Sequence, residues 1–326
     1  MEQYHTRKVP GISQSEKAIV EYIRTFYSGI VLENVKGVLE GKIELDIYVP
    51  DKHLAIEFNG CYWHSDAVGV KIGEVPSRDR RLFAKWRHFE KYRLCTKKGI
   101  RLIQVFEDDF QLRREIVFSI IRNAMGFSPA RIFARKCVLQ DVPLDVYRAF
   151  LDDNHIQGYA YADVRKGLYC NGDLVEVIGI NSKGAHSAEP ELVRLCSRKF
   201  TVVSGGFSRL LSVCPFPRLV SYIDLSVFGG SGYTEAGFSP VRVNRPVYFY
   251  VRYGQHVRYP RTRYMRRRIA SDFNSGALKY HNPGESEAVN MYKNGFYRIW
   301  NCGTVKVVRE RQGVNDVRQG ADKVQS

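Results

Sequence analysis

Apolar side chains recur at helical spacing near the start of the chain and predict an amphipathic helix over residues 15–27, with one face formed by Ala18, Ile19, Tyr22, Ile23 and Phe26. Ser13 and Glu16 have the spacing of a capping box, and Ser15 is an alternative cap. The helix is therefore expected to begin between residues 13 and 15.

Two apolar runs follow, Glu44–Val49 and Leu54–Phe58, and both have the character of β-strands. The short link Pro50-Asp51-Lys52-His53 between them is typical of a hairpin turn. A charged stretch over 78–98 predicts a helix that ends at Gly99, followed by a buried strand over 100–106 and an apolar helix over 115–125. The order α-β-β-α-β-α indicates one mixed domain that ends near residue 126.

A Gly-Phe-Ser-Pro link at 126–129 precedes a second region of mixed character. The pattern there predicts a strand over 136–142, a helix over 144–152, a hairpin over 168–180 that turns at Asn171-Gly172, a helix over 191–196, a strand, glycine turn and helix over 202–211, and a strand over 219–224. The sequence thus predicts an α/β (mixed α+β) protein in three consecutive parts: a first domain over 1–126, a second over 130–255 and a basic segment over 256–326, which is rich in Arg and Tyr and partly closes the second core.

Composition narrows the class of protein. The 326 residues carry 50 Lys and Arg against 34 Asp and Glu, a formal charge of +16. No apolar run reaches the roughly 18–20 residues of a membrane span, and the start lacks the apolar core of a secretory signal. The seven cysteines form no CxxC pair. We therefore expect no membrane association, no disulfide framework and no zinc ribbon, and a cytoplasmic location, the host cell cytoplasm if the protein is phage-encoded.

The positive charge is concentrated near the end of the chain, where residues 241–326 hold 17 Lys and Arg against 6 Asp and Glu. Six of the eleven residues over 258–268 are arginines: Arg258, Arg261, Arg263, Arg266, Arg267 and Arg268. Guanidinium groups bind phosphates in pairs of hydrogen bonds, so this strip predicts contact with nucleic acid. The alternatives are a solvated basic helix face and contact with an acidic protein.

The first hairpin carries the candidate chemistry. With a loop over 50–53, Asp46 lies directly opposite Glu57 on the neighbouring strand. Two carboxylates so placed repel unless one is protonated or a cation lies between them, and Mg²⁺ is a divalent ion that prefers oxygen ligands. The alternative is that one carboxylate faces solvent or pairs with a basic side chain.

The residues that follow Glu57 add further candidates. His64 is placed to take a proton from water beside a metal, and Asp66 supplies another carboxylate. Tyr62 and Trp63 are candidates for stacking against bases, with core packing as the alternative.

Asp46, the string Gly60-Cys61-Tyr62-Trp63-His64, the run 78–81 and the run 99–107 together resemble the very-short-patch-repair (Vsr-type) endonucleases of the PD-(D/E)XK superfamily, and related phage and bacterial homing endonucleases. The resemblance covers about residues 13–122. It implies a Mg²⁺-dependent nuclease, with Mn²⁺ as a substitute, that hydrolyses one or both strands of double-stranded DNA. In such enzymes the aspartate at Asp46 holds metal and the histidine at His64 helps to activate water.

The resemblance also implies roles for other positions. The backbone carbonyl of Phe58 would be a metal ligand, and Glu16 would join the site as it does in the wider superfamily. Tyr62 and Trp63 would wedge into the duplex. Arg78, Arg80 and Arg81 are candidate phosphate contacts at the start of the predicted helix.

The sequence departs from this family in three ways. Asn59 stands where the superfamily has the lysine of its E-x-K motif, and it cannot supply a positive charge. Glu57 stands where the repair enzymes have a hydrophobic residue, so its role as a ligand follows the wider superfamily. Cys61 matches a zinc ligand of the repair enzymes, but no further Cys or His follows it closely. We therefore expect no structural zinc.

The second region ends in Tyr233-Thr234-Glu235-Ala236-Gly237-Phe238, which resembles the close of the GNAT acyltransferase fold, including its Mom-like DNA-modification branch. The resemblance spans about residues 132–251 and implies a GNAT-like α/β domain with Asp224 and Tyr233 as catalytic candidates. Three hypotheses follow: a homing-type DNA endonuclease, which we favour, a DNA-modifying acyltransferase, and a non-catalytic DNA-binding protein. The target sequence, the number of strands cut and the oligomeric state are not determined by the sequence.

Overall fold

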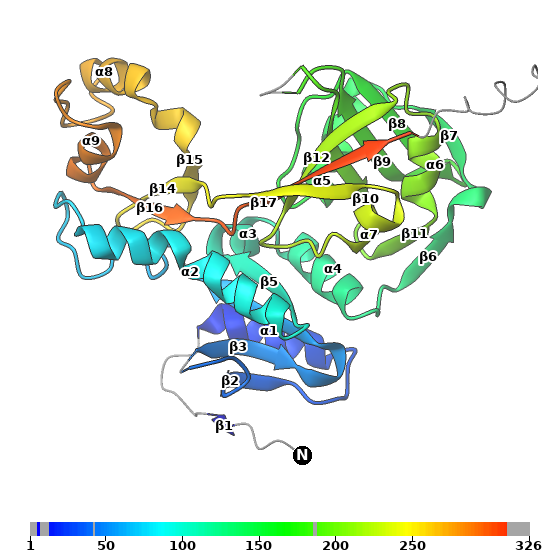
Figure 1. The fold of residues 1–326 in the computed structure, drawn as a ribbon, viewed down its shortest axis with the longest axis horizontal. Helices are drawn as coiled ribbons and strands as arrows, with labels where there is room; N and C mark the ends of the chain where they lie inside the picture. Colours follow the sequence, from blue (N-terminus) through cyan, green and yellow to red (C-terminus); the bar gives the residue numbers. More distant parts are fainter. Residues whose placement is uncertain (1–4, 7–12, 42, 185–187, 312–326) are drawn as a thin grey trace, which may run out of the picture. The chain divides into compact units, whose positions relative to one another are not determined.

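The computed structural model describes residues 5–6, 13–41, 43–184 and 188–311 (Figure 1). The chain divides into two compact units, and it crosses between them more than once. The first unit holds residues 1–130, 224–229 and 243–304, and the second holds 131–223, 230–242 and 305–326. Both mix helices with sheets, so the α/β (mixed α+β) prediction is confirmed at that level.

The first unit is built on a five-stranded sheet in the order β1-β2-β3-β4-β5. Strands β4 and β5 are parallel and the other neighbours are antiparallel. Its elements are β1 His5–Thr6, α1 Gln14–Arg24, β2 Leu32–Lys36, β3 Glu44–Val49, β4 Leu54–Asn59, α2 Arg78–Lys97, β5 Arg101–Phe106, α3 Glu107–Leu112 and α4 Arg114–Ala124. The predicted strands, helices and hairpin of this region are confirmed, whereas the sequence pattern missed β2 and α3.

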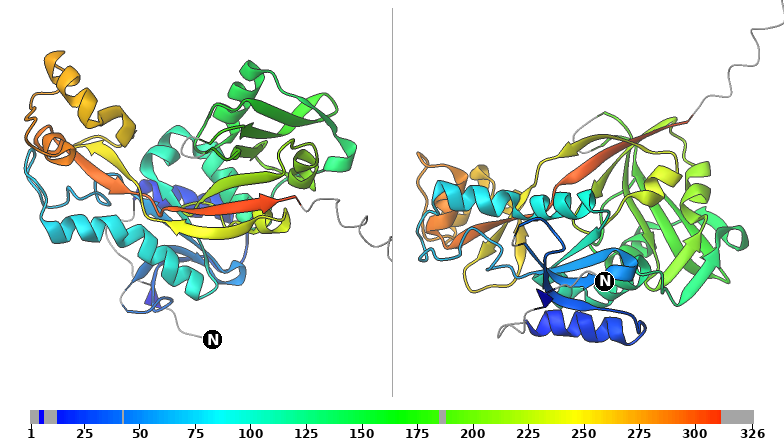
Figure 2. Two further views of the ribbon diagram at one scale, coloured as in Figure 1. Left: turned by 45° about the horizontal axis from the view of Figure 1, so that its top comes forward. Right: turned by 60° about the horizontal axis from the view of Figure 1, so that its bottom comes forward.

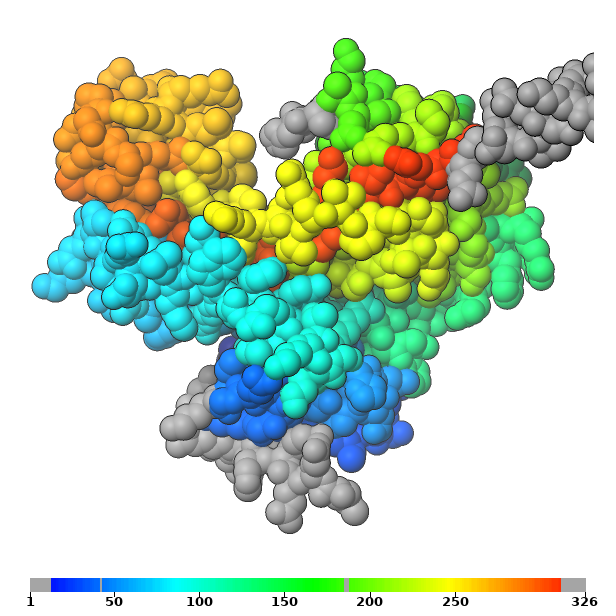
Figure 3. Space-filling model, viewed as in Figure 1, coloured from blue at the N-terminus to red at the C-terminus, as the bar shows by residue number. Residues whose placement is uncertain are grey.

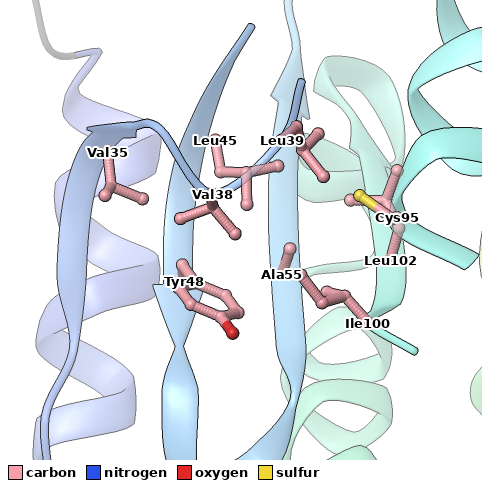
Figure 4. Packing of buried hydrophobic residues seen from close by; sticks show 9 residues of the cluster. All are labelled: Val35, Val38, Leu39, Leu45, Tyr48, Ala55, Cys95, Ile100 and Leu102. Atoms are coloured by element: carbon pink, nitrogen blue, oxygen red, sulfur yellow. The ribbon is translucent and has the colours of Figure 1, made fainter. Parts of the chain in front are cut away.

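Apolar side chains from the sheet and from α2 form one core of this unit (Figure 4). Tyr48, Ala55 and Leu102 come from three neighbouring strands, and Cys95 comes from the helix. Cys95 and Ala55 are fully buried. Burial of this apolar surface fixes α2 against the sheet, at about 25 cal/mol for each Å² removed from water.

Residues 243–304 form a smaller antiparallel sheet in the order β15-β14-β16, with two helices after β15. Its elements are β14 Tyr248–Arg252, β15 Arg258–Pro260, η3 Arg261–Tyr264, α8 Arg266–Asn274, α9 Glu287–Lys293 and β16 Phe296–Trp300. Val251 and Ile299 of this sheet share a buried cluster with Cys61 and Phe106. The segment therefore belongs to the first unit, in contrast to the predicted division into three consecutive parts.

The second unit contains a seven-stranded sheet in the order β13-β17-β12-β10-β9-β8-β7 and a two-stranded sheet, β11-β6. Strands β13 and β17 are neighbours in the larger sheet (Figure 2). The elements are β6 Ala130–Phe133, β7 Val138–Asp141, α5 Leu144–Asn154, β8 Val164–Cys170, β9 Asp173–Asn181, β10 Glu191–Ser197, β11 Thr201–Ser204, α6 Gly206–Ser212, β12 Arg218–Asp224, α7 Ser231–Glu235, β13 Ser239–Asn244 and β17 Thr304–Glu310.

The sequence predicted most of the second unit correctly, with one clear error. Asn171 and Gly172 both have positive φ, as a tight two-residue hairpin turn requires, so the predicted turn is confirmed. The predicted helix over 191–196 is wrong, because these residues form β10, paired with β9 on one side and β12 on the other. Among the described residues, no helix combines the length and the apolar character needed to cross a membrane.

Candidate active site on the first hairpin

The two predicted carboxylates meet where the β3–β4 ladder ends. The recorded register runs from Val49 opposite Leu54 to Ile47 opposite Ile56. Beyond it, the amide of Asp46 donates to Oε1 of Glu57 (3.1 Å) and the amide of Phe58 donates to Oδ2 of Asp46 (2.9 Å). Each carboxylate therefore accepts from the backbone of the other strand, which holds both acids at one point of the sheet.

A lysine from α2 completes this cluster. Nζ of Lys91 forms an ion pair with Oε2 of Glu57, which is almost fully buried. Lys91 reaches the sheet because it shares a helix face with Ala84, His88 and Cys95, all of which are buried. The spacing of 84, 88, 91 and 95 is that of one helical stripe, so packing of the helix delivers the ammonium group to the carboxylates.

One ammonium group does not balance two carboxylates. Burial and, next, the negative charge of Glu57 raise the pKa of Asp46 to about 7, although Lys91 acts to lower it. Burial alone would lower the pKa of Lys91, but the charges of Glu57 and Asp46 outweigh it, and the net shift is upward. Lys91 therefore stays protonated at neutral pH, whereas Asp46 titrates near neutrality.

His64 and His88 form a chain of hydrogen bonds through their ring nitrogens. Nδ1 of His88 lies 2.6 Å from the carbonyl oxygen of Trp300 and must carry the proton there, because a carbonyl only accepts. Nε2 of His88 is then an acceptor, so Nδ1 of His64, 2.9 Å away, is the donor. This leaves the lone pair of Nε2 on His64 facing Nη2 of Arg87 at 3.3 Å.

Both imidazoles are neutral at pH 7. Burial, followed by the neighbouring His88, Arg87 and Lys91, lowers the pKa of His64 well below its usual value. Burial lowers the pKa of His88 to about 3. A neutral His64 has a lone pair on Nε2 to accept a proton, provided that the Arg87 guanidinium moves to another acceptor such as a phosphate.

Arg87 links the histidines to the carboxylates. Burial lowers the pKa of Arg87, and the negative charges of Glu57 and Asp46 offset part of this shift. The guanidinium therefore interacts electrostatically with both carboxylates. It also donates through Nη1 to the carbonyl of Trp63 (3.0 Å). Arg87 and Lys91 are four residues apart on α2, so one helical turn presents both cations.

Glu16 and Asn59 occupy two different positions around this cluster. The amide of Glu16 donates to Oγ of Ser13 (3.1 Å), which confirms Ser13 as the helix cap. Burial and then the charge of Asp46 raise the pKa of Glu16, so the two acids interact. Asn59 is buried and donates through Nδ2 to Oε1 of Gln104 on β5 (3.2 Å), which gives it a packing role.

Asp66 is bound in a separate cluster of the same unit. It is fully buried, and it accepts from the hydroxyl of Tyr292 (2.7 Å), from the amide of Arg298 (2.8 Å) and from Nε of Arg298 (3.3 Å). These contacts use both of its oxygens. The structure thus gives Asp66 a role in joining the 60–70 loop to β16, and it does not bring Asp66 to the carboxylate pair.

The aromatic residues before His64 differ in exposure. Trp63 is 68% exposed, whereas Tyr62 is half-buried and packs edge-on against Tyr253 with ring centroids 5.6 Å apart. An exposed indole beside a candidate hydrolytic site is available for stacking on a base. The predicted phosphate contacts Arg78, Arg80 and Arg81 all lie in the first turn of α2, after the cap Ser77.

The arginines of the predicted DNA-binding strip have different environments. Arg258 is largely buried and forms ion pairs with Asp108 (2.7 Å) and Asp109 (2.6 Å). Arg261 forms a two-pronged pair with Glu287, with 3.0 Å between Nε and Oε1. The structure therefore gives Arg258 a structural role. The guanidinium of Arg266 donates to the carbonyl of Pro283, while Arg263, Arg267 and Arg268 are exposed.

The side chains around Asp46 fit a divalent cation in part. No group of three or more His, Cys, Asp and Glu side chains suited to a metal occurs in the described part of the chain. Mg²⁺, however, is commonly bound by one or two carboxylates and completes its shell with waters and substrate phosphates. Asp46 fits that role, because a carboxylate has about four acceptor positions and because burial, followed by the negative charge of Glu57, raises its pKa. Glu57 fits less well while Lys91 occupies it.

The predicted glycine turn of the second unit has an acidic neighbour. Gly205 and Gly206 begin α6, as predicted. The carboxylate of Glu176 packs so closely there that a Cβ on Gly206 would lie 1.7 Å from Oε2 of Glu176. Burial raises the pKa of Glu176 to about 7. Tyr233 has its hydroxyl 3.5 Å from Oγ of Ser221, while Asp224 belongs to the first unit.

Comparisons with known proteins add little to this geometry. No protein-family model matches the chain, and no curated protein matches its sequence. Among solved structures, the chain is similar to N-acetylglutamate synthase from Neisseria gonorrhoeae, complexed with coenzyme A and N-acetyl-glutamate, at 11% identity and a TM-score of 0.29. The match covers 93% of this chain and 60% of the length of that protein. A TM-score this low carries no argument about fold or activity.

Proposed function

We propose that this protein is a Mg²⁺-dependent DNA endonuclease whose active site is formed by Asp46, Glu57 and Lys91. The observation that supports the proposal is the convergence of two carboxylates and one lysine at the end of the β3–β4 ladder. The sequence lacks the lysine of the E-x-K motif, and Lys91 brings an ammonium group to Glu57 from α2 instead. Asp46 would hold the metal, with Mn²⁺ as a substitute and the carbonyl of Phe58 as a further ligand.

In this proposal each residue has a defined task. A bound divalent cation supplies charge to the scissile phosphate and lowers the pKa of a water. Lys91 stays protonated and adds positive charge for the phosphate as it gains negative charge. His64 accepts the proton of the attacking water at Nε2 once Arg87 has turned to a phosphate oxygen. Trp63 contacts the duplex from the adjoining loop.

The experiment is a strand-breakage assay on supercoiled plasmid and on a pool of long random-sequence duplexes, with Mg²⁺ or EDTA. The wild type and an Asp51→Asn control should break DNA only with Mg²⁺, and Asp46→Asn should not. Asp51 suits the control because it lies exposed on the same hairpin. Intact DNA in every arm would count against the nuclease, and breakage by Asp46→Asn would count against this site.

A second candidate function concerns the second unit alone. Its parallel pair β10–β12 is joined at only two positions, Glu191 with Val220 and Leu192 with Ser221, and β10 has an irregularity just beyond them. Strands that part in this way leave backbone groups to pair with an extended ligand such as an acyl-CoA arm. The test is thermal protection by acetyl-CoA, which should be equal in the wild type and Asp46→Asn. An unchanged melting temperature in both would remove this candidate.

A further inference from the structure

The 243–304 segment of the first unit contains a hollow with a cavity volume of about 400 Å³. Its lining residues come from the end of β14, the η3 turn, α8 and the start of β16. Figures 1 and 3 colour this segment yellow to orange. None of the residues assigned to the carboxylate cluster lines it. The hollow is therefore a separate feature of the same unit.

Positive charge dominates the wall of this hollow. Arg252, Arg263 and Arg268 line it, and Asp272 is the acidic residue among the lining side chains. None of the three arginines is within ion-pair distance of a carboxylate in the part of the chain that the structure describes. In contrast, Arg258 in the same segment forms ion pairs with Asp108 and Asp109.

Aromatic rings hold two of these guanidinium groups in place. Arg263 lies over the rings of Tyr259 (5.0 Å to the centroid) and Tyr264 (5.6 Å), and Arg252 lies over Phe296 (5.6 Å). A guanidinium stacked on a ring keeps its N–H donors free in its own plane. The arrangement thus presents donors while it restricts the motion of the side chains.

The floor of the hollow is apolar and rigid. Tyr264, Leu278 and Phe296 line it and belong to a buried core cluster. The rings of Tyr264 and Phe296 have centroids 4.9 Å apart, so each supports the other. The small exposed part of these side chains gives the hollow an apolar surface against which a base can pack.

We infer that this hollow binds one unpaired nucleotide of a DNA strand, with its base against the Tyr264 and Phe296 floor and its phosphate on Arg252, Arg263 and Arg268. Small-molecule sites have volumes of about 300–1,000 Å³, so a hollow of about 400 Å³ has the size expected for a single nucleotide. The inference rests on the proposed function only in naming DNA as the source of the nucleotide. Contact through phosphates alone would require neither the hollow nor its aromatic floor.

The test measures binding of the full-length protein in EDTA, so that cleavage does not interfere. The probes are a labelled duplex with one unpaired nucleotide, the same duplex fully paired, the single strand and free dAMP. We expect the bulged duplex and the single strand to bind at least 10-fold more tightly than the paired duplex. Stronger competition by dAMP than by the single strand would instead identify a free nucleotide as the ligand and overturn the inference.

Three variants separate the hollow from general positive charge. Arg268→Gln should reduce the preference for the bulged duplex at least 5-fold, whereas Arg267→Gln, its exposed neighbour on α8, should leave the preference unchanged. Ala277→Trp keeps every charge but fills the hollow, and it should remove the preference. Equal losses in Arg267→Gln and Arg268→Gln, or full preference in Ala277→Trp, would overturn the inference. Because Asp46→Asn should bind as the wild type does, loss of cleavage and loss of this site are distinguishable.

Discussion

Asp46 and Asp66 are both aspartates of the first unit, and burial raises the pKa of both. They differ in what surrounds them. Asp66 contacts a guanidinium and a phenol, and every other influence on its pKa is a lowering one. Asp46 lies against a second carboxylate and shares a single ammonium group with it.

The difference shows how to tell a structural acid from a functional one. When an acid is buried with a cation and hydrogen-bond donors, its removal leaves those partners unpaired and destabilises the fold. An acid left with excess negative charge costs stability in the absence of a ligand, and it is retained where a cation or a substrate supplies the balance. By this criterion we propose the carboxylate pair as the functional element, whereas Asp66 joins the 60–70 loop to β16.

The largest expected effect concerns Lys91. Lys91→Met should reduce Mg²⁺-dependent strand breakage by about 10²–10³-fold, because it removes the cation that faces the reacting phosphate. Lys97→Met is the matched control, since Lys97 lies on the same helix and forms an exposed pair with Glu40. Breakage rates of folded protein at saturating DNA measure the effect. Equal rates for the two variants would show that Lys91 only packs.

Asp66 should matter for stability instead. Asp66→Asn leaves Arg298 without its partner and should lower the free energy of unfolding by about 3 kcal/mol. Chemical denaturation monitored by tryptophan fluorescence checks this. At a temperature where the variant is fully folded, its strand breakage should equal that of the wild type. A folded Asp66→Asn that breaks no DNA would contradict the distinction between the two acids.

His64 should make a moderate contribution with a characteristic pH profile. His64→Gln should slow strand breakage by about 10²-fold, the lower end for loss of a general base. At low Mg²⁺ the rate should rise with pH up to about 7 as Asp46 ionises, and it should do so in both proteins. If the rise disappears in His64→Gln, the histidine and not Asp46 is the titrating group.

The smallest effect is on thermal stability without metal. The pKa of Asp46 is higher in the folded chain than in an unfolded one, so its contribution is favourable at low pH and is lost as pH rises from about 4 to about 7. Asp46→Asn removes this loss and should raise the melting temperature by about 2–4 °C at pH 8, with no gain at pH 4. Calorimetry in EDTA at both pH values measures it.

The sequence predicted the carboxylate pair because strand pairing is local. A four-residue link fixes which residues of β3 and β4 lie opposite, so Asp46 and Glu57 could be placed together from spacing alone. The sequence could not predict that the ladder ends at Ile47 and that side chains then bond to the opposite backbone. That change depends on the separation of the strands, which no residue pattern records.

Lys91 was missed because apolar and polar side chains are mixed all around α2, so the sequence marks no single apolar face. The one available signal was the stripe 84, 88, 91 and 95, in which Ala84 and Cys95 flank two polar residues on the buried face. The ion pairs of Asp66 and Arg258 could not be predicted, for a different reason. Their partners, Arg298 for one and Asp108 for the other, are more than a hundred residues away in sequence. Only the packing of the 243–304 segment shows these ion pairs.

The difference between the two acids is tested most directly by titration with Mn²⁺, a paramagnetic substitute for Mg²⁺, followed by electron paramagnetic resonance in the presence of short duplex DNA. The wild type, Asp51→Asn and Asp66→Asn are compared with Asp46→Asn, all fully folded. The account predicts that Mn²⁺ affinity in Asp46→Asn is at least 10-fold lower than in the wild type. In Asp51→Asn and Asp66→Asn it should equal that of the wild type. Unchanged Mn²⁺ affinity in Asp46→Asn, or a loss confined to Asp66→Asn, would contradict it.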